Sequence, residues 1–299
     1  MTKSTTATRR PLGFGAIAGW TFLLAFCFIS LLPLWVAIKA ALTLPREFFG
    51  SAASIGLPDN PTFGNFLRVL GLPNDIQLTS IKASPINFLL AMRNSFIYTT
   101  LVVSGQLFFS ALAAYAFARL KFPGREFLFY MFLSATMIPG IVLFIPNFIL
   151  IRELGWIDTF QGMVVPFILM TPFAVFFLRQ FFLSSPYEIE EAARLDGASP
   201  FKIFWLIALP MQKAPIATLA ILLSINAWNE FFWPYLVGHD ESVRVMAVAL
   251  ADFKSQTGDG VPDWTGLMAA TILSIVPIII LLFFFGRRIV ESLQSSGMK

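Results

Sequence analysis

The sequence predicts an all-α integral membrane protein with six transmembrane helices and both termini in the cytoplasm. Three observations lead to this prediction: the composition, the long apolar stretches, and the placement of lysine and arginine between them. Of the 299 residues, 57% are hydrophobic and only 13% are charged, and 34 are phenylalanine. Soluble domains contain about a quarter charged residues. A soluble fold of this chain would therefore expose large apolar patches.

Six stretches are long and apolar enough to cross a membrane as helices. About 20 apolar residues cross a hydrocarbon layer of ~30 Å, because a helix rises about 1.5 Å per residue. We expect the first stretch to be an uncleaved anchor, because its apolar run is too long for a signal peptide and no small-x-small site ends it. Within one transmembrane domain, 1–299, the predicted spans are about 16–38, 94–118, 127–151, 163–182, 215–237 and 265–285.

Prolines interrupt the third and fourth predicted spans. Pro139 and Pro146 lie in the third, and Pro166 and Pro172 lie in the fourth. Proline removes a backbone hydrogen bond and bends a helix, which membranes tolerate where neighbouring groups or water satisfy the freed carbonyl. Two interpretations stay open: the interruptions line a path for a solute, or they are packing kinks.

The basic residues orient the chain. Thirteen of the 21 lysines and arginines fall in the segments that are cytoplasmic if the N-terminus is, and eight fall in the outer segments. The positive-inside rule therefore places both termini in the cytoplasm. The basic residues are scattered among short loops, so they do not form the contiguous basic patch that a nucleic-acid-binding protein requires. The thirteen are Lys3, Arg9, Arg10, Arg119, Lys121, Arg125, Arg179, Arg194, Lys202, Lys213, Arg287, Arg288 and Lys299.

Cysteine and histidine are too rare for most catalytic chemistry. Cys27, the one cysteine, lies within the first apolar stretch, and His239, the one histidine, lies beside Asp240 and Glu241 in a predicted loop. A zinc site usually takes three or four protein ligands, and an enzyme needs titratable groups gathered at one depth. We expect no metal and no catalytic residue in this chain.

The longest predicted cytoplasmic segment, about 184–213, contains two helices separated by a glycine. Ser185 and Glu188 have the spacing of a capping box, with Pro186 at the first helical position. Three glutamates in the first turns suit the helix dipole. Gly197 is placed to end this helix in a left-handed conformation, and Ser199 begins a second, strongly apolar helix. We expect the pair to form a rigid lever.

Seven residues of this segment stand in a fixed frame: Glu191, Ala192, Ala193, Gly197, Ile207, Leu209 and Pro210. Their spacing resembles the EAA signature of binding-protein-dependent ABC importer permeases. The resemblance implies a type I ABC importer permease fold whose first loop helix docks into a separate ATPase subunit, so that ATP-driven closure switches the membrane gate. The alternative is that these residues form only an ordinary capped helix.

Other stretches resemble the second permease of the carbohydrate-uptake branch, which includes the maltose transporters. They are residues 114–125 and 227–234 and, more loosely, Arg287–Arg288 with Gly297–Lys299. The resemblance implies inward movement of a disaccharide or oligosaccharide across a bacterial or archaeal inner membrane by alternating access. It also implies a second permease, two ATPase copies that bind ATP and Mg, and an extracytoplasmic solute-binding protein. The chain has no Gly-Lys dipeptide, so it contains no phosphate loop of its own.

Polar residues in the fifth predicted span are candidates for the solute path. Asn226, Asn229, Glu230 and Trp233 follow the i, i+3, i+4, i+7 spacing of one helix face. An ionisable residue inside a membrane is a functional-site hypothesis, and amides, a carboxylate and an indole suit a sugar. Two other interpretations stay open: Trp228, Trp233 and Tyr235 belong to an interfacial aromatic belt, or the asparagines join helices.

Two other transport functions remain as alternatives. A secondary carrier driven by an ion gradient usually has inverted repeats and charges at the membrane midplane, and we find no such repeat in this sequence. An ABC importer permease for a polyol or a glycerol phosphate would share every feature described above.

Overall fold

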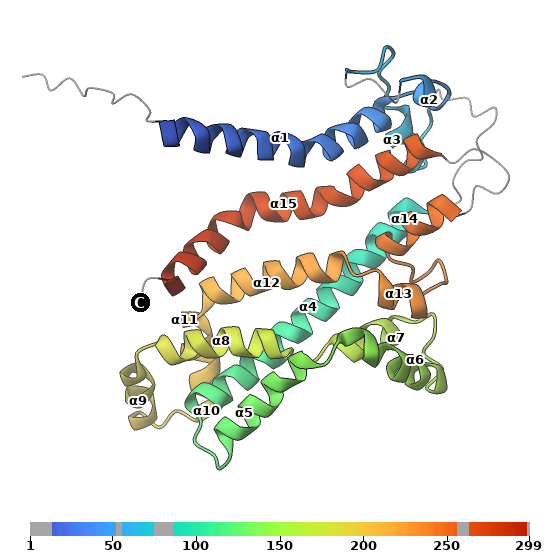
Figure 1. The fold of residues 1–299 in the computed structure, drawn as a ribbon. Coiled ribbons are helices and arrows are strands. Elements are labelled where there is room, and N and C mark those ends of the chain that lie inside the picture. The colour runs from blue at the N-terminus through green and yellow to red at the C-terminus, as the bar shows by residue number, and fades with distance from the viewer. Residues whose placement is uncertain (1–13, 52–55, 75–85, 256–262, 298–299) are drawn as a thin grey trace, which may run out of the picture.

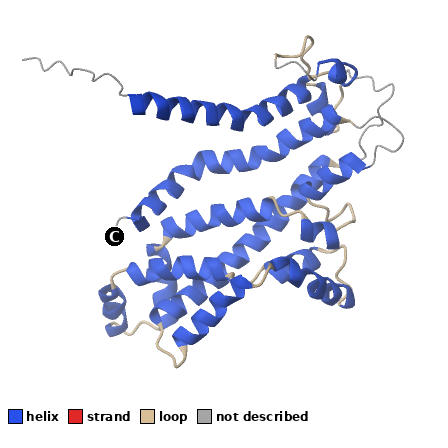
Figure 2. Cartoon of the chain, viewed as in Figure 1, coloured by secondary structure: helices blue, strands red, loops and turns tan. Residues whose placement is uncertain are grey.

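The computed structural model describes residues 14–51, 56–74, 86–255 and 263–297. Within these ranges the chain forms helices and loops and no strand, so the predicted all-α class is confirmed (Figure 2). Several residues used to orient the chain lie outside the description of the backbone or of the side chains. They are Lys3, Arg9, Arg10, Lys82, Lys254, Arg287, Arg288 and Lys299.

Within the described ranges, three helices are long and apolar enough to cross a membrane unbroken: α1 (Phe14–Leu42), α4 (Phe88–Arg119) and α15 (Trp264–Gly297). Three bent helix pairs bring the number of spans to as many as six. They are Arg125–Met137 with Gly140–Glu153, Phe160–Phe167 with Pro172–Ser184, and Pro200–Met211 with Lys213–Trp228, bent by 91°, 47° and 78°.

The shorter elements make up these pairs and the loops. They are η1 (Pro45–Glu47), α2 (Phe48–Ser51), α3 (Gly64–Val69), α5 (Arg125–Ser134), η2 (Ala135–Met137), η3 (Gly140–Leu143), α6 (Phe144–Glu153), α7 (Phe160–Val164), η4 (Val165–Phe167), α8 (Pro172–Ser184), α9 (Tyr187–Leu195), α10 (Pro200–Ile203), the π-helix η5 (Phe204–Ala208), α11 (Leu209–Met211), α12 (Lys213–Trp228), α13 (Phe232–Val237) and α14 (Met246–Ser255).

Two of the four prolines mark the breaks in the third and fourth spans. Pro139 lies between the two helices of the 91° bend, and Pro172 begins α8 after the 47° bend. Both positions suit a residue without an N–H group, because the first N–H groups of a helix have no partner within the helix. Pro146 lies inside the first turn of α6, and Pro166 lies in a 3-10 turn.

The fifth predicted span, 215–237, is not one helix. The helix α12 ends at Trp228, two residues of irregular chain follow Asn229, and α13 begins at Phe232. At its other end, α12 is joined through a bend to the second helix of the 184–213 segment, and the two helices together form one of the bent pairs. The sequence does not reveal this break, because apolar residues continue on both sides of it with the spacing expected of one helix.

The central helix of the molecule is α4, which packs against α8 on one side and α12 on another, while α15 packs against α1 and α12 (Figure 1). Figure 1 also shows α9, α10 and α11 near one end of the bundle, together with the first residue of α1 and the last residues of α15. We call this the α9 end. The helices α2, α3 and α14 lie at the opposite end, the α14 end.

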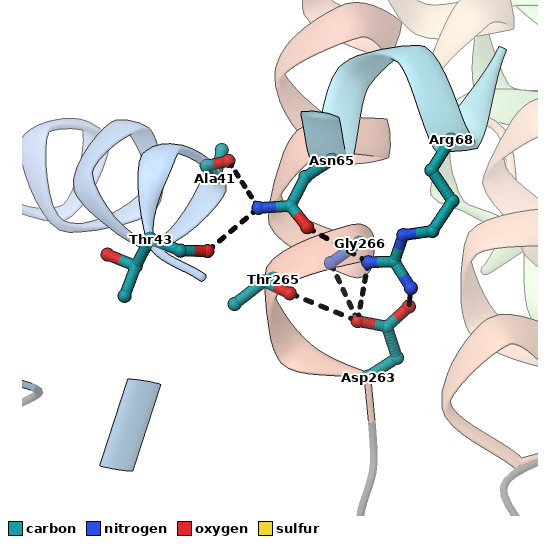
Figure 3. Close-up of polar contacts among 7 residues, drawn as sticks. All are labelled: Ala41, Thr43, Asn65, Arg68, Asp263, Thr265 and Gly266. Atoms are coloured by element: carbon teal, nitrogen blue, oxygen red, sulfur yellow. Dashed lines mark hydrogen bonds and ion pairs between the residues drawn. The ribbon is translucent and has the colours of Figure 1, made fainter. Parts of the chain in front are cut away.

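A buried ion pair joins the short helix α3 to the beginning of α15 at the α14 end (Figure 3). Arg68 of α3 contacts both carboxylate oxygens of Asp263, and its Nη2 lies 2.9 Å from Oδ1. Asp263 also accepts hydrogen bonds from the Gly266 N–H and the Thr265 hydroxyl. Through the bond from Gly266, the Asp263 carboxylate caps the first turn of α15. A Cβ at Gly266 would lie 2.4 Å from that carboxylate, so only glycine fits there.

Asn65 extends this cluster to α1. Its amide donates to the backbone carbonyls of Ala41 and Thr43 at 2.8 Å each, and its oxygen accepts from Arg68 (Figure 3). Asn65 is fully buried, and a buried amide without partners would be unfavourable. The contacts therefore fix α3 against the last turn of α1 and the first turn of α15.

Candidate functional site

The first helix of the 184–213 segment, α9, is attached to α4 by a buried carboxylate. Glu190 Oε1 lies 2.9 Å from Arg119 Nε, and their side chains are 4% and 6% exposed. The Tyr115 hydroxyl donates to Glu190 Oε2 at 3.2 Å, and Arg194 lies 3.5 Å from the same oxygen. Tyr115, Arg119 and Glu190 are buried while Arg194 is partly exposed, and the ion contact of Arg119 Nε compensates the buried carboxylate although this Nε makes no hydrogen bond.

Aromatic and backbone contacts complete this attachment. The guanidinium groups of Arg119 and Arg194 lie 5.4 and 5.1 Å from the centre of the Tyr187 ring. A hydrogen bond from Arg194 to the Tyr187 hydroxyl raises the pKa of Arg194 further, so this guanidinium stays charged at every physiological pH. Arg119 Nη2 also donates to the Ser185 carbonyl at 2.8 Å. The beginning of α9 is therefore fixed to the last residue of α4.

The opposite face of α9 is exposed. Glu191 and Ala192 are exposed, and Ala193 is half-buried. Beside them, Leu195 is 90% exposed and Ile189 is also exposed, which is unusual for large apolar side chains on a short polar helix. Such a patch on a firmly attached helix is typical of a surface that another protein covers.

Gly197 ends α9 as predicted. Its φ of +82° lies in the left-handed region, which glycine adopts without the clash of a Cβ. The Gly197 N–H donates to the Arg194 carbonyl and the Ala198 N–H to the Ala193 carbonyl, each at 3.0 Å. This pattern is a Schellman-type helix end, and it sets the angle at which the second helix begins. Ser199 caps that helix by accepting from the Lys202 N–H at 3.3 Å.

The predicted capping box at Ser185 is wrong. Pro186 is the residue before α9, whose N-cap receives no side-chain hydrogen bond. Ser185 instead donates to the Phe181 carbonyl in the previous helix and accepts from Gln212 Nε2 at 2.6 Å. Ser185 makes this tertiary contact instead of capping α9 because Gln212 is buried and its amide needs a hydrogen-bond partner. Ser185 therefore joins the two ends of the segment, 27 residues apart.

The second helix of the segment contains a π-helical turn that the sequence does not predict. It begins at Pro200 as an α-helix, becomes π-helical from Phe204 to Ala208, and ends at Met211. Ile207 and Leu209 are half-buried, and Pro210 is exposed. π-helical turns occur as single insertions, frequently at functional sites. Here the turn precedes the 78° bend into α12.

A second ion pair braces the neighbouring helices at the α9 end. Arg179 of α8 contacts both oxygens of Glu126 at 2.9 and 3.0 Å, and its Nε donates to the Phe117 carbonyl. The guanidinium also lies 4.0 Å from the centre of the Phe129 ring. A single nitrogen, Nη2, is shared by the two carboxylate oxygens, and the Nε hydrogen bond to α4 fixes the orientation of the guanidinium. The helices α4, α5, α8 and α9 are therefore held together where the loop segment attaches.

The four polar residues of the fifth predicted span do not share a helix face. Asn226 is on α12 and exposed, and Asn229 is exposed with its amide bonded to the Ile225 carbonyl at 2.8 Å. Glu230 lies in the break, where its Oε1 accepts from the N–H groups of Phe232 and Trp233. The helix-face interpretation is therefore wrong, because α12 ends before Asn229.

Both tryptophans of this region are buried. Trp233 is fully buried, and its indole N–H donates to the Gly162 carbonyl at 3.2 Å. Trp228 donates to the Ser274 carbonyl at 3.1 Å and packs on the Phe96 ring. An interfacial belt would place these rings at the lipid surface, so the belt interpretation is wrong for both residues. They instead join the break to α7, α4 and α15.

Comparison with known proteins identifies the family. Residues 106–295, which contain the loop segment and the break after α12, match the model for "Binding-protein-dependent transport system inner membrane component". The chain belongs to this family. The EAA frame in the loop segment is typical of the family, and the chain is a transport permease subunit rather than an enzyme.

Curated relatives match most of the permease. It is 32% identical over 268 residues to the sn-glycerol-3-phosphate transport system permease protein of Pectobacterium atrosepticum, covering 89% of this chain and 91% of the relative. It is 36% identical over 206 residues to the arabinooligosaccharides transport system permease protein of Halalkalibacterium halodurans, covering 69% and 72%.

Solved structures share the fold. A bacterial ABC transporter involved in the import of the acidic polysaccharide alginate has a chain similar to the permease with a TM-score of 0.78 and 23% identity, covering 95% of this chain and 99% of that one. A second structure, the alginate transporter in complex with an alginate pentasaccharide-bound periplasmic protein, gives a TM-score of 0.55 at 14% identity.

Sequence reasoning missed the residues that attach α9 to the rest of the permease. In the sequence, Glu190 is one of three glutamates that suit the helix dipole. Arg119 helps to orient the chain and lies in the stretch 114–125 that resembles the second permease. One signal was available: Glu190 and Arg194 are four residues apart in α9, the spacing of neighbours on one helix face. That spacing predicts an ion pair within α9, but the partner on α4, 71 residues earlier in the sequence, is visible only in the folded chain.

Proposed function

We propose that this permease is one of two membrane subunits of an ABC importer, that α9 is the helix on which an ATPase subunit acts, and that the cargo is a sugar. The observation that carries the coupling role is the combination of a buried anchor, Glu190 with Arg119, and an exposed opposite face on one short helix. A helix that transmits force needs a rigid attachment on one side and a free surface on the other. Family membership supports the importer class.

The coupling surface consists of exposed EAA residues and the apolar side chains beside them. Glu191 offers a carboxylate to a basic partner, and the small side chain of Ala192 lets a partner backbone approach closely. Leu195, which is 90% exposed, supplies the apolar contact. Gly197 sets the angle to the second helix. Residues Ala193, Ile207, Leu209 and Pro210 are less exposed or lie on that second helix, and we assign them to transmission rather than to docking.

In this proposal the α9 end faces the cytoplasm. The excess of lysine and arginine in the segments at that end supports this orientation, since thirteen of 21 fall there by sequence. The first residue of α1 and the end of α15 lie at the same end, which agrees with an even number of spans (Figure 1). The α14 end then faces an extracytoplasmic binding protein, a partner class that the structurally similar alginate transporter has in its complex with a periplasmic protein.

The solute path is proposed to run past the break between α12 and α13. Asn226 and Asn229 are exposed, and Glu230 is half-buried. Amide and carboxylate groups can exchange hydrogen bonds with sugar hydroxyls. Trp233 faces the interior instead, so we assign it the role of holding the break in place rather than of binding solute.

ATP and Mg are assigned to the ATPase subunits, since the chain has no Gly-Lys dipeptide for a phosphate loop. The remaining partners are a second permease, two ATPase copies and a solute-binding protein. Two solute classes are supported by relatives: an oligosaccharide, as for the arabinooligosaccharide permease, and a glycerol phosphate. We favour a sugar, because the proposed path contains a carboxylate, which would repel a phosphate.

Purification of the permease from its native membrane in mild detergent tests this proposal. Identification of every co-purifying polypeptide is expected to yield an ATPase, a second permease and a binding protein. Calorimetry of that binding protein with oligosaccharides and with glycerol phosphate then separates the two solute classes. Recovery of the permease alone, with uptake that persists after ATP depletion, would contradict the importer assignment.

A further inference from the structure

An apolar groove opens at the α9 end between α4, the π-helical turn and the start of α12. Its volume is about 500 Å³, and it is lined by Phe108 and Ala111 of α4, by Trp205 of the π-helical turn and by Ala217 of α12. The Phe108 and Trp205 rings lie 6.1 Å apart, so they pack against each other in its wall. A groove of this size accommodates an apolar group as large as a drug molecule.

One charged residue, Lys213, lines this groove. It is the first residue of α12 and is exposed. All other lining residues are apolar, so no carboxylate among them neutralises the ammonium group. The groove therefore combines an apolar interior with a single positive charge, which is the complement of an amphiphile with an anionic head.

Lys213 lies on the side of the groove that is nearer to the α9 end, because it is the first residue of α12. Gln212, next to Lys213, bonds to the Ser185 hydroxyl, and the Ser185 carbonyl accepts from Arg119, the last residue of α4. An anionic head group at Lys213 would therefore lie beside polar groups, with its acyl chain against the apolar residues of the groove.

We propose that this groove binds an acyl chain of an anionic phospholipid whose phosphate pairs with Lys213. A lipid fits better than a segment of a second protein, because a protein that covers the groove would have to bury or neutralise the lysine. Basic sites between transmembrane helices near one membrane surface are typical sites for anionic lipid head groups. An acyl chain would fill the groove without any polar contact.

The bound chain would lie against the π-helical turn. Because Trp205 belongs to this turn, which precedes the 78° bend into α12, an occupied groove supports the bend from one side. Any effect on coupling to an ATPase rests on the proposed function of α9. Lipid binding itself does not rest on that function, so the lipid proposal and the coupling proposal can be contradicted separately.

Photo-crosslinking tests the lipid site. The intact complex is reconstituted in phosphatidylcholine vesicles with a trace of phosphatidylglycerol or phosphatidylcholine that carries a photoactivatable group on one acyl chain, and labelled peptides are mapped by mass spectrometry. We expect labels within 107–111 and 204–217, with phosphatidylglycerol favoured about fivefold, the ratio that corresponds to about 1 kcal/mol for one lysine.

Two variants and one control sharpen the test. Lys213→Gln is expected to remove the head-group preference, and Ala217→Phe to abolish labelling by both lipids because the ring fills the groove. Lys202→Gln removes another exposed lysine of the same segment that does not line the groove, and it should keep the fivefold preference. Equal labelling by both lipids in the unaltered complex would overturn the proposal. So would labelling confined to other helices, the result expected if the second permease covers the groove.

Discussion

Glu190 of α9 and Arg119 at the end of α4 form an ion pair of 2.9 Å that is almost completely buried. The pair connects a loop helix to the central helix of the permease, the Tyr115 hydroxyl donates to the other carboxylate oxygen, and Arg194 lies 3.5 Å from that oxygen. Loss of one partner from such a pair leaves a buried charge without compensation, which costs about 3–5 kcal/mol. The ion pair is thus the charged part of the attachment of α9, which the Tyr115 hydroxyl and the contact of Arg119 with the Ser185 carbonyl complete.

Substitution Glu190→Gln should release α9 from α4 while the transmembrane helices stay folded. Because about 1.4 kcal/mol corresponds to a factor of ten, we expect uptake by the reconstituted complex to fall by more than about tenfold. ATP hydrolysis should continue but no longer respond to solute. Glu188→Gln, which removes an exposed carboxylate from the same helix, is the control and should retain uptake.

A double substitution separates charge burial from the contact itself. Arg119→Met with Glu190→Met removes both charges, and replacement of a buried pair by apolar residues is often neutral for stability. We expect the double variant to unfold at a higher temperature than Glu190→Gln. An equal or lower unfolding temperature would mean that the ion pair does not hold α9 in place.

Gly197 should tolerate few substitutions, although space around it is open. Its φ of +82° makes any side chain other than a short polar one strained, by about 1–2 kcal/mol for alanine. Uptake should fall in the order glycine, asparagine, alanine, tryptophan, since asparagine is the residue that most readily replaces glycine at such a helix end. Gly140→Ala, at a glycine with open space and no positive φ, is the matched control.

The Gly197→Trp variant gives the decisive test of the docking surface, when its solute uptake and ATP hydrolysis are compared with those of the unaltered complex. A bulky ring at the junction should uncouple transport from ATP hydrolysis even where the protein is folded. Normal uptake with normal ATPase activity would show that the angle between the two helices of the segment does not matter for coupling.

The Arg68–Asp263 pair predicts a stability defect at the opposite end. Asp263→Asn leaves Arg68 buried without a counter-charge, and we expect the free energy of unfolding to fall by about 3–5 kcal/mol. Thermal unfolding in detergent measures this change. The exposed pair Arg46–Glu47 in the same loop serves as control, because exposed ion pairs contribute about 0–1 kcal/mol, so Glu47→Gln should have little effect.

The proposed solute path is tested by substitutions that leave the break between α12 and α13 intact. Glu230→Gln keeps an oxygen for the Phe232 and Trp233 N–H groups, so it removes the charge alone. We expect Glu230→Gln and Asn229→Ala to raise the KM for uptake by about two- to tenfold, the equivalent of one hydrogen bond. Unchanged kinetics for every solute carried would remove this region from the path.

Trp233→Phe provides the contrast for that experiment. It removes the hydrogen bond to the Gly162 carbonyl but no exposed group. We expect a lower unfolding temperature with an unchanged KM. A raised KM with unchanged stability would instead place Trp233 in the path.

Local features of the permease follow from the sequence because they depend on neighbouring residues. The left-handed Gly197 and the Ser199 cap were predictable, since a helix end needs partners for its own last carbonyls and first N–H groups. The break at Pro139 follows for the same reason. The seven-residue EAA frame predicted the family, which the comparison confirms.

Features that depend on distant partners were not predictable. Ser185 has the spacing of a capping box, yet Gln212 and the Phe181 carbonyl take its hydroxyl. The fifth span has the period of one helix, yet it ends at Trp228, where the indole bonds to Ser274. In both cases a buried polar group finds a partner elsewhere in the fold, and such a contact outweighs a local preference of about 1 kcal/mol.

The sequence by itself determined the membrane class, the helical fold and the family, because lipid requires long apolar helices whatever their partners. Only the tertiary structure decided which charges are buried and what they hold. Arg119 with Glu190, and Arg68 with Asp263, pair across 71 and 195 residues of chain. Their energies depend on distance and on exclusion of water, and neither quantity is encoded in the spacing of residues along the chain.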